Sequence, residues 1–311
     1  MYAYMNTCIG YMFNEIWGDL LYIVIFISIC IVLFMIFDAK TSRSDGVYLP
    51  TTHPYRKIMP FVMKSRNESL VYFDLSIPSK NLHTFLDKRE HVGMTQCVVA
   101  AVSKVLHEYP NANRFVSGGR LYQRNEVVVS FSMKRQKMGE RSKIAVVRQV
   151  VRKEDLFDQI CTSMNQKVDV ERSDATTYAD KEYSLLTSLP RFVLRVGVWL
   201  VQTLDDYNIL PQSFIENDGL YCSAFVANVG SLGMSPGYHH LYEWGNCPIF
   251  ITVGATEERS ICINSSIQVC DIIPLRIAFD ERINDALGVK KAIDKLKEIL
   301  SEPDLLLPNE D

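Results

Sequence analysis

The chain has no basic residue near its N-terminus and no excess of positive charge overall. Lys40 is the first lysine or arginine in the 311 residues. A secretory signal peptide begins with a basic segment and ends at a small-residue cleavage site, and neither is found here. The net charge of −3 offers no cationic face for a polyanion, which argues against binding to DNA or RNA.

The cysteines lack the spacing of a metal site or of a redox pair. None of the eight lies in a Cys-x-x-Cys motif or at a zinc-ligand distance from a histidine. We therefore expect free thiols and no bound metal. The cysteines are Cys8, Cys30, Cys97, Cys161, Cys222, Cys247, Cys262 and Cys270.

Charge is also absent from residues 20–37, a run of large apolar residues. Such a run nearly matches the ~20 residues that cross ~30 Å of hydrocarbon, so it predicts one transmembrane helix and contact with membrane lipid. Glu15 and Asp19 precede the run, and Lys40 and Arg43 follow it. By the positive-inside rule, the main domain lies in the cytoplasm.

The remaining chain divides by composition. Residues 1–19 form a short N-terminal segment, 38–54 a polar linker, 55–307 a folded domain and 308–311 a tail. Apolar periodicity in the domain predicts helices over 79–90, 95–109 with Thr95 as N-cap, 153–167 and 284–300. Strands are expected over 70–75, 119–123, 126–133, 143–151, 222–229, 248–253 and 268–279. This mixture favours an α+β fold.

A second apolar stretch, residues 185–204, is interrupted by Pro190, Arg191 and Arg195, so it is a poor membrane span. One interpretation is a core helix whose arginines reach out to solvent. The other is an interfacial helix lying on the bilayer, with Phe192 and Trp199 on its apolar face.

A motif follows the last expected strand. Asp280 to Asp285 reads Asp-Glu-Arg-Ile-Asn-Asp. It resembles the Asp-His-Arg-x-x-Asp-Gly signature of the catalytic domain of 2-oxoacid dehydrogenase acyltransferases and, more distantly, of chloramphenicol acetyltransferase. In the same order along the chain, four further pieces resemble family motifs. They are Arg56–Lys64, Cys97–Pro110 with Asn113, Asn228–Gly230 and Val253–Ala255.

The resemblance implies a two-layer α/β sandwich, a homotrimer and an active site between neighbouring subunits. It also implies that the chain belongs to a membrane-anchored branch of this family, without lipoyl modules. In the family, a histidine takes the proton of the acceptor and a serine stabilises the oxyanion. Here Glu281 stands at the histidine position and Ala227 at the serine position.

Several residues could carry the chemistry in this chain. Glu281 is either a base with a desolvated carboxylate or a charged strut paired with Arg282 or with an arginine of another subunit. Asp285 either supports the catalytic group or caps the final helix. Ser223 and Ser231 lie near the vacated hydroxyl position. Asn228 and Arg282 are candidate contacts for coenzyme A.

His239 and His240 are adjacent in an aromatic segment. They could supply a replacement base, bind the acyl partner, or simply pack. A metal would need a third ligand that the spacing does not reveal.

Two functions follow from this pattern. The first is a membrane-anchored acyltransferase that moves an acyl group from coenzyme A, or a carrier thioester, to a hydroxyl or thiol acceptor, with no tightly bound cofactor. The second is a catalytically inactive scaffold of the same fold, which the joint replacements at residues 227 and 281 favour.

Overall fold

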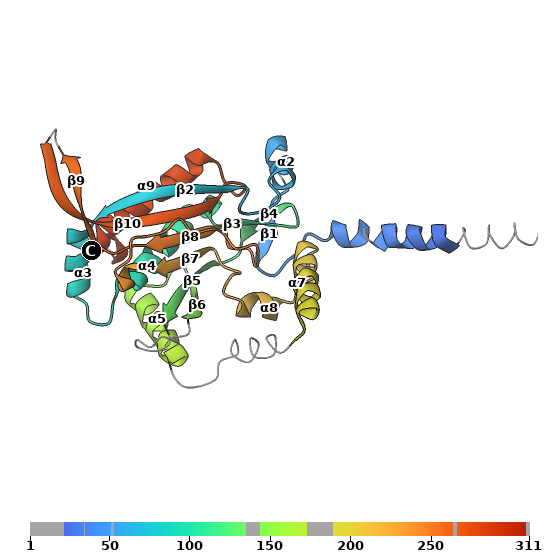
Figure 1. The fold of residues 1–311 in the computed structure, drawn as a ribbon, viewed down its shortest axis with the longest axis horizontal. Helices are drawn as coiled ribbons and strands as arrows, with labels where there is room; N and C mark the ends of the chain where they lie inside the picture. The colour runs from blue at the N-terminus through green and yellow to red at the C-terminus, as the bar shows by residue number, and fades with distance from the viewer. Residues whose placement is uncertain are drawn as a thin grey trace, which may run out of the picture. The chain divides into compact units, whose positions relative to one another are not determined.

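The computed structural model describes residues 22–33, 35–50, 53–134, 144–172, 189–263 and 266–308. The chain forms two compact units, Met1–Ser42 and Arg43–Asp311 (Figure 1). The family motifs and the aromatic segment around His239 and His240 all fall in the second unit. Each unit is described by itself.

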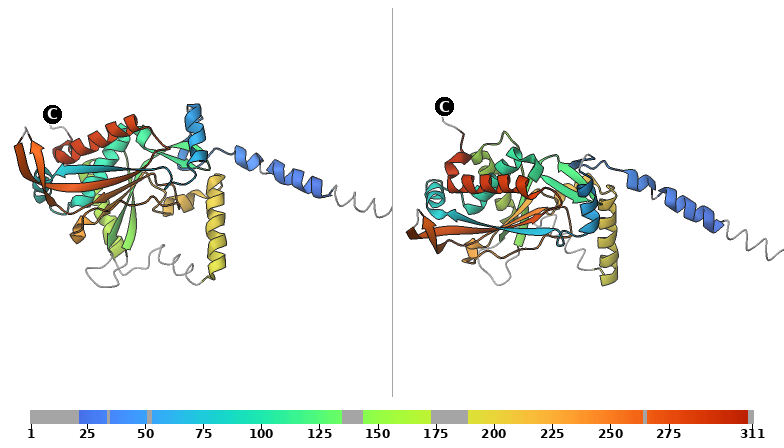
Figure 2. Two further views of the ribbon diagram at one scale, coloured as in Figure 1. Left: turned by 45° about the horizontal axis from the view of Figure 1, so that its top comes forward. Right: turned by 90° about the horizontal axis from the view of Figure 1, so that it is seen from above.

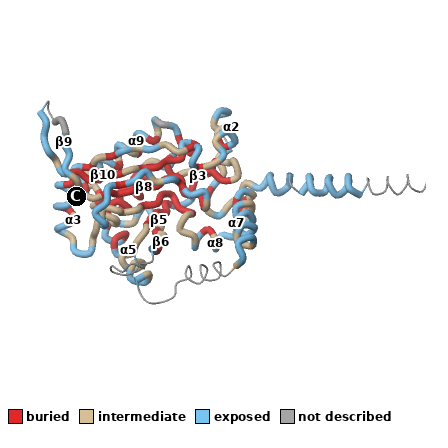
Figure 3. Tube along the Cα trace, viewed as in Figure 1, coloured by how far each residue is buried: buried red, intermediate tan, exposed pale blue. Residues whose placement is uncertain are grey.

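The first unit contains one long apolar helix. Tyr22–Ala39 has a mean hydropathy of 2.7 and none of it is buried within the protein, so within the described residues one helix has the length and composition to cross a membrane. The predicted span at residues 20–37 overlaps this helix. Its side chains are exposed along its whole described length (Figure 3).

The second unit is built on a seven-stranded mixed sheet. The strand order is β2-β10-β8-β7-β5-β6, and β9 pairs with the free part of β10. The pairs β5–β7 and β7–β8 are parallel and the others are antiparallel. The strands are β2 (Leu70–Pro78), β5 (Val127–Lys134), β6 (Ile144–Val151), β7 (Ala224–Asn228), β8 (Ile249–Val253), β9 (Glu257–Ile263) and β10 (Ser266–Asp280).

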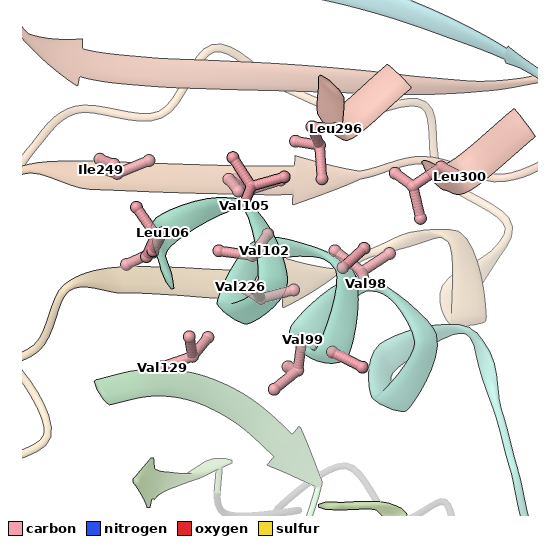
Figure 4. Close-up of a cluster of buried hydrophobic side chains, with 14 of the residues drawn as sticks. Val98, Val99, Val102, Val105, Leu106, Val129, Val226, Ile249, Leu296 and Leu300 are labelled. Atoms are coloured by element: carbon pink, nitrogen blue, oxygen red, sulfur yellow. The ribbon is translucent and has the colours of Figure 1, made fainter. Parts of the chain in front are cut away.

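Helices cover one face of this sheet (Figure 2). They are α3 (Ser79–Asp87), α4 (Met94–Glu108), α5 (Phe157–Arg172) and α9 (Ala286–Ser301). Helix α4 lies at the centre because its sequence is apolar on nearly every side, and Val98, Val102 and Val105 pack between the strands and α9 (Figure 4). Burial of each such side chain contributes about 1.5–3 kcal/mol.

Among the described residues, the opposite face carries no helix. A smaller apolar cluster lies there, with Phe225 stacked on Phe250 at 4.9 Å between ring centroids. The segment from Gly230 to Cys247 runs over this side and contributes Leu241 to the cluster. This segment begins with a short 3₁₀ turn, Gly230–Leu232, and contains no strand. The predicted arrangement, a mixed sheet with helices on one face, is confirmed.

A second, three-stranded sheet stands beside the first. Its order is β1-β4-β3, from Gly46–Tyr48, Arg120–Arg124 and Arg114–Ser117. The described part of the unit also contains the helices α2 (Pro54–Val62), α7 (Arg191–Asp206) and α8 (Gln212–Asn217). Short 3₁₀ turns occupy Pro110–Ala112 and Pro303–Leu306.

Some local predictions were wrong. The predicted linker 38–54 contains β1, because Arg43 and Asp45 bring this stretch into the folded unit. The N-cap of α4 is Gly93 and not Thr95, whose hydroxyl accepts from Asn228 instead. Residues 185–188 of the predicted second apolar stretch lie outside the described residues.

Candidate active site

A buried ion pair shapes the turn that carries the signature motif. Asp280 ends β10 and Arg282 follows two residues later, and both are almost fully buried. The guanidinium of Arg282 donates from Nε to Oδ1 at 2.8 Å and from Nη2 to Oδ2 at 2.7 Å. Ser69 donates to the same Oδ1 at 2.8 Å. This two-point pairing fixes the path of the turn, since planar guanidinium and carboxylate groups match in only one orientation.

Glu281, between these two residues, faces outward. Its backbone N–H donates to the carbonyl of Ser69 at 2.9 Å, and its side chain is exposed on the isolated chain. The predicted pairing of Glu281 with Arg282 is wrong, because Arg282 is already paired with Asp280. Pairing with an arginine of another subunit stays a prediction. The turn therefore presents a free-standing carboxylate to whatever surface lies opposite.

Asp285 caps α9, which confirms one of the two roles predicted for this residue. Its Oδ1 accepts from the N–H of Gly288 at 2.8 Å. Its Oδ2 also lies 3.4 Å from Nη2 of Arg56, a residue of α2. Burial and the nearby Arg56 lower the pKa of Arg114, so a second cation lies in the same corner. Asp285 thereby ties the motif to α2.

The predicted hydroxyl donors have different surroundings. Ser223 is fully buried, and its Oγ accepts from the N–H of Val128 at 3.0 Å, so this hydroxyl bridges β5 to the start of β7. Ser231 is exposed and donates to the carbonyl of Asn228 at 2.9 Å. The Asn228 side chain accepts from the N–H of Ser231 and donates to Thr95, which stabilises the turn after β7.

Ala227 lies on the helix-free face of the sheet. Its partner in register on β8 is Thr252, so both side chains point to the same side. Thr252 is buried, and its hydroxyl has no hydrogen-bond partner among the described residues. Sequence reasoning missed this hydroxyl, because only the strand register brings it beside residue 227.

The histidine pair packs over the same face. The His239 ring is stacked on Phe250 at 3.9 Å between centroids, and its Nδ1 lies 2.7 Å from the carbonyl of His240. Both rings also contact Tyr242. Burial and the neighbouring His240 lower the pKa of His239, although its backbone hydrogen bond acts the other way. The contacts described for these rings do not reach Glu281.

One loop connects the histidine segment to the motif. Arg66, which follows α2, donates to the carbonyls of Tyr242, Glu243 and Gly245. Glu243 accepts in return from the backbone N–H groups of Arg66 and Asn67. Ser69, three residues on, holds Asp280. Loop 66–69 therefore sets the position of residues 242–245 relative to the Glu281 turn.

A cavity of about 480 Å³ opens next to this loop. Its wall combines Phe61 of α2, the Gly118–Gly119 turn, Asp206 of α7, and Trp244. Arg282, a predicted coenzyme contact, also lines it, whereas Asn228 does not. The sequence gives no sign of this cavity, because its walls come from segments that are far apart along the chain.

Metal chemistry finds no support in the described part of the chain. No group of three His, Cys, Asp or Glu side chains there is placed to hold an ion. Six cysteines among the described residues are free thiols.

Comparison with known proteins gives structural matches alone. No family model and no curated protein matches the sequence. The chain is similar to a probable dihydrolipoamide acetyltransferase from Listeria monocytogenes 4b F2365, with a TM-score of 0.50 and 14% identity over 86% of this chain and 98% of that one. It is also similar to a chloramphenicol acetyltransferase, with a TM-score of 0.50 and 11% identity over 82% and 100%. The fold is that of the chloramphenicol acetyltransferase-like acyltransferases.

The predicted resemblance is therefore confirmed at the level of fold. This acyltransferase fold covers the second unit, and the exposed Glu281 lies in the turn between its last strand and its last helix.

Proposed function

We propose that the protein is a membrane-anchored acyltransferase that moves an acyl group from coenzyme A, or a carrier thioester, to a hydroxyl or thiol acceptor. One observation carries this proposal. The acyltransferase fold holds the Asp280–Arg282 pair rigidly and leaves Glu281 exposed between them. Among the described residues, no hydrogen bond or ion pair occupies this carboxylate, which leaves it available to an acceptor at the position of the family base.

Glu281 is the base in this mechanism. It takes the proton from the acceptor, whose oxygen or sulfur attacks the thioester carbonyl and forms a tetrahedral oxyanion. The carbon–sulfur bond then breaks, and the coenzyme A thiolate recovers the proton from Glu281. General-base catalysis of this kind is worth ~10² to 10⁴ in rate.

Burial would adapt the carboxylate to this task. A carboxylate in an apolar site is a stronger base than one in water, because desolvation raises its pKa. Glu281 is exposed on the isolated chain, so the covering surface comes from a second copy of the protein. A homotrimer with the active site between neighbouring copies supplies it, as the resemblance implies. Ser231, His239 and His240 are then candidates for contacts with the acyl group.

The membrane location rests on the helix Tyr22–Ala39. Its cationic C-terminal flank, with Lys40 and Arg43, favours a single-pass protein with its main domain in the cytoplasm. The acyl donor is a soluble co-substrate in this scheme, and no tightly bound cofactor is required.

Ala227 favours the second candidate, an inactive scaffold. An oxyanion-stabilising donor is worth ~10² to 10³ in rate, and this position no longer has one. An inactive protein of this fold would still assemble at the membrane and bind a partner through its interface.

Purified full-length protein, incubated with acetyl-coenzyme A and dihydrolipoamide as probe acceptor, tests the proposal. We expect Glu281→Gln to lower kcat/KM by ~10² or more, because the amide accepts no proton at neutral pH. Glu281→His should keep activity, and the exposed Glu258→Gln serves as a control. Unchanged turnover in Glu281→Gln would refute the mechanism. If the wild type showed neither turnover nor coenzyme A binding, the inactive scaffold would be the remaining candidate function.

A further inference from the structure

Helix α7 exposes an apolar face that the described chain does not cover. Phe192, Val196 and Trp199 follow one another at helical spacing and are 71%, 53% and 62% exposed. Of the sixteen residues of this helix, Asp205 alone is buried. A helix of a globular domain normally turns its apolar stripe toward the core. This helix does the reverse.

Helix α2 repeats the pattern next to the same cavity. Tyr55, Ile58 and Val62 lie along one side and are 65%, 58% and 67% exposed. Both helices contribute to the wall of the 480 Å³ cavity, and they stand at the same end of the folded unit in each view (Figure 2). Soluble monomers rarely expose apolar surface of this extent, so the two faces together mark an interaction site.

The flanking charges fit a lipid surface. Arg191 and Arg195 precede Phe192 and Val196 by one position each, so a cationic stripe borders the apolar one on α7. Lys57 is exposed on α2. Interfacial helices combine these features, with apolar rings in the acyl boundary and cations among anionic headgroups. Tryptophan is enriched at that depth because its ring is amphipathic.

The connection between the apolar helix and the folded unit is short. The apolar helix ends at Ala39, and Arg43 is already held in the folded unit by an ion pair of 2.9 Å with Asp205 of α7. Four residue steps span at most about 14 Å. For a chain anchored by this helix, the connection alone limits the distance between the end of the span and Arg43 to about 14 Å, roughly two headgroup layers.

We infer that the apolar faces of α2 and α7 rest in the headgroup region of the bilayer and form a docking surface for lipid. This inference depends on the proposed membrane anchoring. It also defines the acceptor class further. The Arg56–Asp285 pair ties α2 to the Glu281 turn. A docked α2 thus holds that turn beside the membrane, where an acceptor with a hydrophobic tail reaches it.

Tryptophan quenching in vesicles tests the inference with the full-length chain. Trp17, Trp199 and Trp244 are the three tryptophans. The variant Trp17→Phe is reconstituted into phosphatidylcholine and phosphatidylglycerol vesicles with or without bromine on the acyl chains. We expect brominated lipid to lower its emission roughly twofold, since one of the two remaining rings lies among the lipids. The matched variant Trp17→Phe/Trp199→Phe retains only the cavity-lining Trp244 and should be quenched far less.

The possible results distinguish failure of the lipid-docking inference from failure of the proposed membrane anchoring. If both variants are quenched equally while the protein resists extraction by alkaline carbonate, the anchor stands and the docking surface is refuted. If carbonate extracts the protein, the anchoring fails and the inference fails with it. If Trp199 is shielded from aqueous acrylamide but not quenched by brominated lipid, protein covers this face, which also overturns the inference.

Discussion

The ion pair between Asp280 and Arg282 makes the turn at Glu281 rigid. Its members are 1% and 6% exposed, so either charge would remain largely desolvated after the loss of its partner. Removing one partner of a buried pair typically costs about 3–5 kcal/mol, because the other charge remains desolvated. The local effect is large even though the net contribution of the intact pair is small.

Replacement of Arg282 should therefore destabilise the fold. We expect Arg282→Met to lower the free energy of unfolding by about 3–5 kcal/mol in urea titrations. Lys290→Met is the control, since its partner Asp294 lies one helical turn away on an exposed surface. That change should cost about 0.5 kcal/mol or less. Equal losses in the two variants would contradict the role given to the buried pair.

His239 should make stability depend on pH. Burial lowers the pKa of its imidazole below the usual ~6.5, so the unfolded chain takes up the proton first as the pH falls. The neutral ring makes its full contribution to stability at pH values above the unfolded-state pKa of ~6.5. That contribution is lost as the pH falls through the lower folded-state pKa.

His239→Phe keeps a ring on Phe250 and removes this titration. Between pH 7.5 and pH 5, we expect the Tm of the wild type to fall more than that of His239→Phe. The variant His240→Gln removes the lesser cause of the lowered pKa and keeps burial, so its Tm should fall by an amount between those of the wild type and His239→Phe. Parallel Tm curves for wild type and His239→Phe would contradict this account.

Residue identity predicted the importance of the motif but not its contacts. The spelling of Asp280 to Asp285 placed Glu281 at the position of the family base. Only the structure shows that Arg282 pairs with Asp280 and not with Glu281, because carboxylates occupy both of the two preceding positions in the sequence. Ser223 illustrates the same limit. Its burial and its bond to Val128 depend on a strand nearly a hundred residues earlier.

Element boundaries followed from local signals where those signals were strong. The start of α9 was predictable, because Asp285 precedes an apolar periodic run and accepts from Gly288. Strands β1, β3 and β9 were missed. Each is short or exposed, so its place depends on pairing with β4 or β10 and not on an apolar pattern of its own.

The cap of α9 gives a prediction at this scale. Asp285→Ala removes the oxygen that accepts from Gly288 and should cost about 1 kcal/mol, read as a shift in the urea midpoint. Asp285→Asn keeps that oxygen and should cost much less, although it removes the charge facing Arg56. A similar loss in both variants would show that the ion pair, and not the cap, stabilises this corner.

At the scale of the whole molecule, the candidate site joins segments that no sequence window contains. The Glu281 turn, loop 66–69 and residues 242–245 meet through hydrogen bonds of Arg66 and Ser69. Helices α2 and α7 add the cavity wall. The fold class and the order of the motifs could be predicted, since both are recorded along the chain. The cavity and the exposed helix faces could not, because they depend on long-range packing.

The attachment of α7 also depends on a long-range contact. Arg43 pairs with Asp45 and Asp205, and its guanidinium lies over the rings of Phe115 and Tyr122. Burial raises the pKa of Asp205, and Arg43 opposes that shift. Arg43 is therefore the group that holds a buried carboxylate of α7 against the three-stranded sheet.

Loss of Arg43 should release α7 before it affects the main sheet. In Arg43→Met, the carboxylates of Asp45 and Asp205 lose this partner, and such a change costs about 3–5 kcal/mol. We expect amide hydrogens of α7 to exchange faster in the variant, while those of β7 and β8 change much less. The exposed Arg195→Met controls for loss of charge on the same helix. If exchange instead rose equally in α7 and the central strands, Arg43 would stabilise the whole unit and would not act as a specific attachment of the helix.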